Sequence, residues 1–383
     1  MFGIFSRKKK EQTRQIPWDL AALRQRPRID WRGTEARVKE LYYANEPYRG
    51  EETRVYALYS APARAQGKVP GMVLVHGGGG RAFPEWVEMW EERGYAALAM
   101  DLGGCGPDGE RLRGGAGPEQ DAQAKFTDIS DGLENTWPYH AVAAVIRGIT
   151  VLAAQPEVDA ARIGITGISW GGYLTCIAAG LEDRLTCAVP VYGCGFLHEN
   201  STWVPILNKM PEEDRERWIS NFDPSNYLPR AELPMLWVNG TNDFAYPLDS
   251  YRKSYRAAPG PRTLRVTVEM GHGHEPGWGP EEIDMFADHH LRDGEPLPSV
   301  SRMRVEEGRA VATFESPAEV VEGELHFTSD TGAWEQRGWT SVPAELEDDR
   351  VRADLPGERP LAFFITITDS RGATVSTEHE VLN

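Results

Sequence analysis

The chain has 383 residues, 40% hydrophobic and 26% charged, a balance typical of folded globular proteins rather than disordered or fibrous ones. Its formal net charge of −17 at pH 7 repels phosphate backbones, so we do not expect nucleic acid as a partner. No apolar run approaches the roughly 18 residues that a membrane-spanning helix needs.

The N-terminus does not have the pattern of a secretory signal. Its few apolar residues precede the basic run that ends at Lys10, whereas a signal peptide has the reverse order. We expect residues 1–30 to form a mobile tail; weak membrane-surface contact through Phe2 and Phe5 is the alternative. The four cysteines form no CxxC pair and indicate free thiols. These features favour a cytoplasmic protein that does not bind membranes.

Apolar runs alternate with helix-like segments between residues 31 and 293. Strands are expected at 69–76, 95–102, 162–166, 187–192, 234–239 and 265–270, and helices at 83–94, 140–155, 170–180 and 280–291. This alternation predicts a doubly wound, mostly parallel sheet covered on both faces. The stretches of about 103–139 and 195–233 exceed ordinary connections, so we interpret them as insertions beside a functional site.

Helical patterning disappears after the linker at 293–298. Apolar and polar residues alternate at 302–305, 311–314, 323–328, 361–368 and 373–381, with turn signals such as Ser329-Asp-Thr-Gly332 between them. Residues 299–383 are therefore expected to form a small all-β domain, an immunoglobulin-like sandwich.

The strongest chemical signal is the sequence Gly167-Ile-Ser169-Trp-Gly171-Gly172. It matches the G-x-S-x-G nucleophile elbow, in which a serine stands at a sharp turn between a strand and a helix. The glycines allow the close backbone approach of that turn, and the helix N-terminus favours developing negative charge. Since a strand is expected before Ser169 and a helix after it, we predict that Ser169 is a nucleophile.

A serine nucleophile needs a base and an acid that orients the base. Asp243 is the candidate acid because it follows an apolar strand that ends in Asn-Gly; Asp249 is the fallback. The base is expected in His272-Gly-His274, after the last strand of this region. His272 is nearer the strand and flanked by glycines, and His274 remains the alternative. A metal site at these two histidines lacks a third ligand, so none is predicted.

Backbone amides are expected to stabilise an oxyanion. One is the amide of Trp170, directly after the nucleophile. The other should come from His76-Gly-Gly-Gly-Gly80, with Gly78 and Gly79 as candidates. A dinucleotide or phosphate loop is not supported, because the glycines have neither the G-x-G-x-x-G nor the Gly-Lys-Ser/Thr spacing. No cofactor is predicted.

These motifs occur in the order seen in α/β-hydrolases, and residues from about 35 to 292 resemble that superfamily. The doubled glycine after the elbow and the Asn239-Gly-Thr-Asn-Asp243 stretch resemble a group that includes acetyl xylan esterases, dienelactone hydrolases and prolyl oligopeptidase catalytic domains. The chain has no room for the propeller of prolyl oligopeptidases, and its nucleophile is a serine rather than the cysteine of dienelactone hydrolases.

The resemblance implies a serine carboxylesterase acting on small acyl or acetyl esters, with acetylated carbohydrates among the candidate substrates. A serine aminopeptidase or acylaminoacyl peptidase, and a non-catalytic binding protein that uses the β-domain, are the alternatives. The substrate pocket is expected to be aromatic, lined by Trp137, Tyr139, Trp203 and Tyr246. A small-molecule ester is the expected partner, and the sequence leaves a homo-oligomer open.

Overall fold

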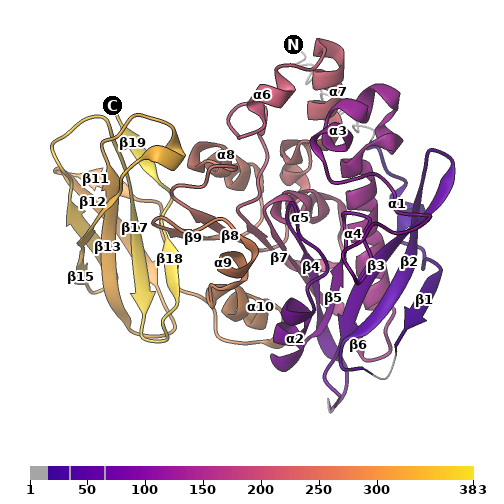
Figure 1. The fold of residues 1–383 in the computed structure, drawn as a ribbon. Coiled ribbons are helices and arrows are strands. Elements are labelled where there is room, and N and C mark those ends of the chain that lie inside the picture. Colours follow the sequence, from indigo (N-terminus) through magenta and orange to yellow (C-terminus); the bar gives the residue numbers. More distant parts are fainter. Residues whose placement is uncertain (1–15, 34–35, 64–65) are drawn as a thin grey trace, which may run out of the picture.

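The computed structural model describes residues 16–33, 36–63 and 66–383 (Figure 1). The proposed membrane contact of Phe2 and Phe5 lies outside the described residues. Within them, no helix is long and apolar enough to cross a membrane. The four cysteines are free thiols, and Cys105 is the only one of them that is not buried.

A nine-stranded sheet forms the centre of the larger part of the molecule, in the order β1-β2-β3-β5-β4-β6-β7-β8-β9. Pairing is antiparallel from β1 to β5 and parallel from β5 to β9. The crossovers between non-consecutive neighbours explain why the inner strands are buried apolar runs, since helices cover both faces. The strands are β1 (Ile29–Arg32), β2 (Lys39–Tyr48), β3 (Glu51–Ser60), β4 (Val69–Val75), β5 (Ala96–Met100), β6 (Val158–Ile168), β7 (Leu185–Val191), β8 (Met235–Gly240) and β9 (Arg262–Thr267).

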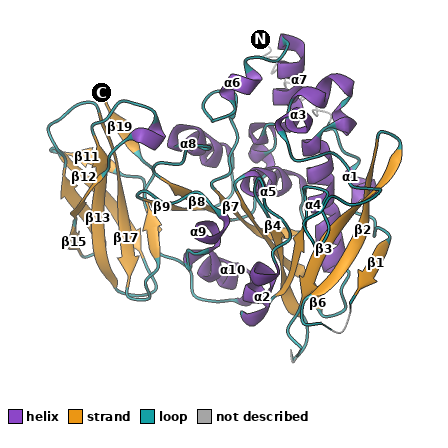
Figure 2. Cartoon of the chain, in the orientation of Figure 1, coloured by secondary structure: helices purple, strands orange, loops and turns teal. Residues whose placement is uncertain are grey.

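Helices pack on both faces of this sheet (Figure 2). Helices α4 and α5 contact each other on one face, and α2 and α10 lie together on the other, where Arg292 bonds to the Arg93 carbonyl. The helices are α1 (Leu20–Leu23), α2 (Pro84–Glu92), α3 (Ala122–Lys125), α4 (Trp137–Ala153), α5 (Trp170–Leu181), α6 (Val204–Leu207), α7 (Glu212–Phe222), α8 (Leu248–Ala257), α9 (His274–Trp278) and α10 (Glu282–Arg292).

The expected tail is wrong for residues 16–30, which are part of the folded structure. Trp18 is buried, donates a hydrogen bond from Nε1 to the Tyr139 carbonyl at 2.9 Å and stacks on the Tyr139 ring. Strand β1 already begins at Ile29. The segment is too short to show a periodic pattern, so only its packing against distant residues reveals that it is ordered.

The two expected insertions contain short helices that meet above α5. Helix α3 belongs to the first, and helices α6 and α7 belong to the second (Figure 1). Trp218 of α7 donates from its indole to the Lys125 carbonyl at 2.7 Å, and Arg217 bonds to the Ile129 carbonyl. The insertions therefore form one layer over the end of the sheet where the site lies.

The C-terminal part is all β, as expected, and consists of two antiparallel five-stranded sheets. The predicted strand at 373–381 is two strands, β18 and β19, and the structure adds β10 and β14 to β16, each of which is at most 5 residues long. The strands are β10 (Ser299–Val300), β11 (Arg304–Glu306), β12 (Arg309–Glu315), β13 (Val320–Thr328), β14 (Thr340–Pro343), β15 (Glu345–Glu347), β16 (Arg350–Asp354), β17 (Leu361–Asp369), β18 (Thr374–Ser376) and β19 (Glu380–Leu382).

The β-domain packs against β9 and α8 through an apolar cluster with polar contacts around it. Leu248 of α8 and Val266 of β9 pack against Trp334 and Phe364 of the β-domain. The Val266 amide donates to Ser376 Oγ at 2.7 Å. The two parts are thus joined both by a buried apolar contact and by hydrogen bonds.

Candidate active site

Ser169 occupies the expected elbow between β6 and α5. It is a non-glycine residue at φ 59°, a strained conformation that survives only where the surroundings enforce it. Strand β4 packs closely against this turn, since a Cβ on Gly171 would lie 1.9 Å from the Val75 carbonyl oxygen. Gly171, two residues after the serine, is thus required for α5 to approach β4, and the turn holds the serine clear of the sheet.

Asp243, His272 and Ser169 form one hydrogen-bonded chain. His272 Nδ1 lies 2.6 Å from Asp243 Oδ2, and His272 Nε2 lies 2.9 Å from Ser169 Oγ. Because the carboxylate accepts the proton of Nδ1, Nε2 is left as the acceptor of the serine hydroxyl. Asp243 is buried and its Oδ1 accepts the amides of Ala245 and Tyr246, which fixes the carboxylate.

Asp249 and His274, the alternative acid and base, do not belong to this hydrogen-bonded chain. Asp249, at the start of α8, accepts hydrogen bonds from Asn200 Nδ2 and the Ser250 amide. His274 Nε2 accepts the Gly77 amide at 3.0 Å, and burial lowers the pKa of His274 to about 4. A neutral imidazole suits an acceptor, so His274 supports the glycine loop while His272 faces the serine.

The glycine loop has one amide left for a ligand. Gly77 donates to His274, Gly79 donates to Gln120 Oε1 at 3.2 Å, and Gly80 donates to the Gly77 carbonyl. The Gly78 amide has no partner among the described residues. The Trp170 amide opens helix α5, where a first-turn N–H has no intrahelical acceptor. Gly78 and Trp170 are thus the better-placed pair of the three expected donors.

Three of the four expected pocket residues belong to one aromatic cluster with Trp170, and one does not. Trp203 lies 4.6 Å from Trp170 and 4.9 Å from Tyr246 between ring centroids, and Trp137 lies 5.5 Å from Trp170. Trp137 and Tyr246 are fully buried, so they support this cluster from beneath, and Trp203 is partly exposed. Tyr139 instead stacks on the distant N-terminal Trp18, because it projects from the other side of α4.

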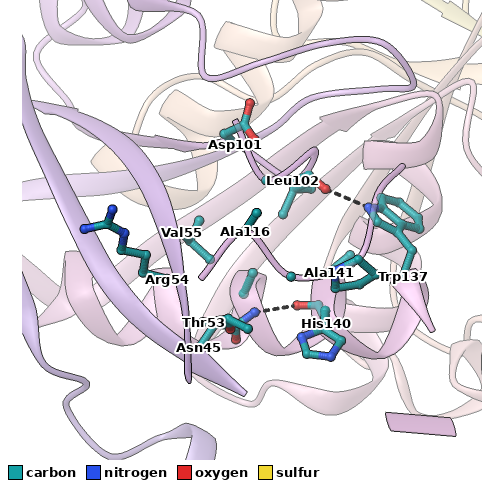
Figure 3. Close-up of a pocket in the computed structure, with 14 residues that line it drawn as sticks. Asn45, Thr53, Arg54, Val55, Asp101, Leu102, Ala116, Trp137, His140 and Ala141 are labelled. Atoms are coloured by element: carbon teal, nitrogen blue, oxygen red, sulfur yellow. Dashed lines mark hydrogen bonds between the residues drawn. The ribbon is translucent and has the colours of Figure 1, made fainter. Parts of the chain in front are cut away.

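Behind Trp137 lies a small cavity of about 30 Å³ (Figure 3). Trp137 closes one end, where its Nε1 donates to the Leu102 carbonyl at 2.7 Å, and Asn45 donates to the His140 carbonyl on the other side. Asp101, which follows β5, also lines it. The cavity is separate from the hydrogen-bonded chain, since none of its lining residues belongs to that chain.

Two aromatic rings that the sequence analysis missed hold His272. Tyr192 lies 4.6 Å from the imidazole on one side and Phe244 lies 4.9 Å from it, both between ring centroids. Tyr192 is buried, whereas Phe244 is 53% exposed. The position of Phe244 directly after the acid was the signal available in the sequence; Tyr192 follows β7 and had none.

A buried lysine was also missed. Lys125 of α3 is 8% exposed, its Nζ donates to the Gln120 carbonyl at 2.8 Å, and it lies 4.9 Å from the centre of the Trp170 ring. Burial lowers the pKa of Lys125 to about 8. The lysine connects the first insertion to the elbow tryptophan and to the segment that contacts the glycine loop. Among the described residues, no group of three or more His, Cys, Asp or Glu side chains could hold a metal ion.

A strained serine at a strand-to-helix turn, with its histidine and aspartate after later strands of a largely parallel sheet, defines the α/β-hydrolase class. Residues 12–275 match the acetyl xylan esterase (AXE1) family, and the chain belongs to that family. By its description the family is one of carboxylic ester hydrolases, the enzyme class expected from the sequence. The expected resemblance to acetyl xylan esterases is confirmed.

Individual relatives agree with this placement. An acetyl esterase, Axe7A, from Xylanibacter ruminicola is 23% identical over 193 residues, which are 47% of this chain and 44% of that protein. The chain thus matches less than half the length of this curated relative.

Solved structures show the same fold. An acetyl xylan esterase from Paenibacillus sp. R4 superposes with a TM-score of 0.59 at 25% identity, covering 71% of this chain and 92% of that one. Acetyl xylan esterase 1 from Thermoanaerobacterium sp. JW/SL YS485 gives 0.57 at 20% identity, covering 71% and 94%.

Proposed function

We propose that the protein is a serine esterase that hydrolyses small acyl esters, acetyl esters above all, through Ser169, His272 and Asp243. The observation that carries the proposal is the continuous hydrogen-bonded chain from Asp243 Oδ2 to Ser169 Oγ. Membership of the acetyl xylan esterase family supports the acetyl group as the acyl part. Acetylated carbohydrates are the corresponding candidate substrates.

The proposed reaction begins when Ser169 Oγ attacks the ester carbonyl carbon and passes its proton to His272 Nε2. Asp243 stabilises the resulting imidazolium, and the amides of Trp170 and Gly78 donate to the oxyanion. Collapse breaks the bond to the leaving alcohol, which takes the proton from His272. Water then attacks the acyl-serine, His272 accepts a water proton and returns it to Ser169 Oγ, and the carboxylic acid leaves.

Crowding around the nucleophile supports a small acyl group. Ser169 is only 9% exposed. A Cβ placed on Gly77 would lie 3.0 Å from Ser169 Cβ, so the glycine loop lies directly against the serine. The Trp170 ring also lies against this loop, since a Cβ on Gly78 would lie 3.2 Å from Trp170 Cδ1, and its aromatic neighbours hold the ring in place.

A series of nitrophenyl esters of increasing acyl length tests the proposal, together with acetylated sugars and one aminoacyl-nitroanilide. The expected order is acetate first, with hydrolysis falling as the acyl chain lengthens. Ser169→Ala should lower kcat by roughly three or more decades, whereas Ser130→Ala, at an exposed position of the 3-10 helix Thr127–Asp131, should not change it. Faster hydrolysis of the nitroanilide than of the acetate, or unchanged turnover by Ser169→Ala, would overturn the proposal.

A further inference from the structure

A loop of the β-domain lies against the segment that carries the acid. We call residues 329–339, between β13 and β14, the clasp loop. Asn242 Nδ2 donates to the Arg337 carbonyl at 2.7 Å and to the Glu335 carbonyl at 3.3 Å. Asn242 is the neighbour of Asp243 in the chain, so the β-domain touches the catalytic segment next to its carboxylate.

The same asparagine is linked to the segment that carries the base. Thr241 Oγ1 donates to Asn242 Oδ1 at 2.6 Å and accepts the Glu269 amide at 2.9 Å. Glu269 has φ 53°, an unfavourable conformation for a glutamate, and lies three residues before His272. One path of hydrogen bonds therefore runs from the clasp loop through Asn242 and Thr241 to the start of the His272 loop.

The clasp loop is itself well fixed within the β-domain. Trp334 is buried, and the Arg337 guanidinium lies 3.7 Å from the centre of its ring. Arg337 Nε donates to the Gly332 carbonyl, and the Gly338 amide donates to Asp330 Oδ2 at 2.8 Å. The carbonyls that Asn242 contacts are thus presented by a rigid loop, as a positioning contact requires.

We propose that Asn242 is a positioning residue and that the clasp loop is part of the catalytic apparatus, holding Asp243 and His272 in register with Ser169. The inference rests on the proposed function for its kinetic test. Phe244, on the other side of Asp243, is largely exposed. Without the Asn242 amide, the acid segment loses its two hydrogen bonds to the clasp loop, and displacement of reacting groups by about 1 Å lowers rates by about 10²-fold.

The first test compares Asn242→Ala with Arg256→Gln. Arg256 bonds to Glu378 across the same domain interface but away from the triad, so it is a matched control. Asn242→Ala should lower kcat for nitrophenyl acetate by about 10²-fold with little change in KM, and Arg256→Gln should leave kcat within about twofold. Equal losses in the two variants, or no loss in Asn242→Ala, would overturn the inference.

The second test does not depend on the substrate. The proton shared between His272 Nδ1 and Asp243 gives a downfield NMR resonance, which should shift or broaden in Asn242→Ala and persist in Arg256→Gln. An unchanged resonance in Asn242→Ala contradicts the inference even if the wild type fails to hydrolyse acetyl esters. That failure by itself would refute only the proposed function.

Arg337→Ala supplies a variant on the β-domain side, in case Asn242→Ala does not fold. It loosens the clasp loop without touching Asn242, and it should lower kcat in the same direction by a smaller factor. The double variant Asn242→Ala/Arg337→Ala should have the same kcat as Asn242→Ala, because both substitutions interrupt the same path of hydrogen bonds. Multiplication of the two single effects would show independent action and overturn the inference.

Discussion

Lys125→Met is expected to make the protein more stable at pH 7. Lys125 is almost completely buried, and its Nζ has the Gln120 carbonyl as its hydrogen-bond acceptor within the described part of the chain. Methionine fills a similar volume without a charge. The substitution therefore removes the unfavourable transfer of an ammonium group into the protein, while the packing over Trp170 is kept.

The magnitude follows from the pKa. Burial lowers the pKa of Lys125 from 10.5 to about 8, and at 1.36 kcal/mol per unit the charged form costs about 3 kcal/mol. Cation–π contacts with Trp170 and Trp137 offset about 1 kcal/mol of this. Loss of the hydrogen bond to the Gln120 carbonyl offsets about 1 kcal/mol more, so the expected gain in unfolding free energy is about 1 kcal/mol at pH 7.

The pH dependence of stability checks the sign of the Lys125→Met effect separately. Between pH 8 and 10.5 the unfolded chain binds more protons at this lysine than the folded chain, so wild-type stability rises with pH in that window. The advantage of Lys125→Met should accordingly shrink above pH 8. Urea unfolding at pH 7 and pH 10 measures both effects, with the exposed Lys209→Met as control. A variant less stable than wild type at pH 7, or a gain independent of pH, refutes the reasoning.

Three further predictions concern the glycine loop and the buried histidines. His274→Leu leaves the Gly77 amide unpaired, which should lower stability by about 1–3 kcal/mol and lower kcat for nitrophenyl acetate; an unchanged kcat would separate the loop from catalysis. Gly77→Ala places a methyl 3.0 Å from Ser169 Cβ and should abolish turnover, whereas Gly357→Ala, with open space around it, should not. Burial lowers the pKa of His76 and His274 to about 4, so the unfolded chain binds more protons between pH 4 and 6.5. Stability should fall as pH falls through that window; thermal unfolding that is flat across it would contradict this.

Much of the catalytic domain could be predicted from local pattern. Buried parallel strands such as β4 and β5 are continuous apolar runs, and the elbow has a fixed spacing because only glycine tolerates the contact at Gly171. Ser169, Asp243 and His272 come together because each follows a strand that ends at the same edge of a parallel sheet. The preference for His272 over His274 was also available, from its distance to the strand.

Other features depend on contacts between residues far apart in the chain. The sequence predicts that Trp18 belongs to a tail and that Tyr139 lines a pocket. Both predictions are wrong because the two rings stack on each other. Lys125 gives no sign in the sequence that it is buried, because the second insertion covers it.

The sequence by itself determined that the chain is acidic, that an α/β domain is followed by an all-β domain, and that the site is built on a serine. These features depend on composition, local periodicity and short spacings. The tertiary structure alone decided which amide of the glycine loop lacks a partner among the described residues, because His274 and Gln120, which accept two of the other amides, lie far away in the chain. It also brought the β-domain to the acid, because the Asn242 contacts join residues 93 and 95 positions apart in the chain. A local pattern contains no information about contacts of that separation, which arise only when the packed domains fix the two loops side by side.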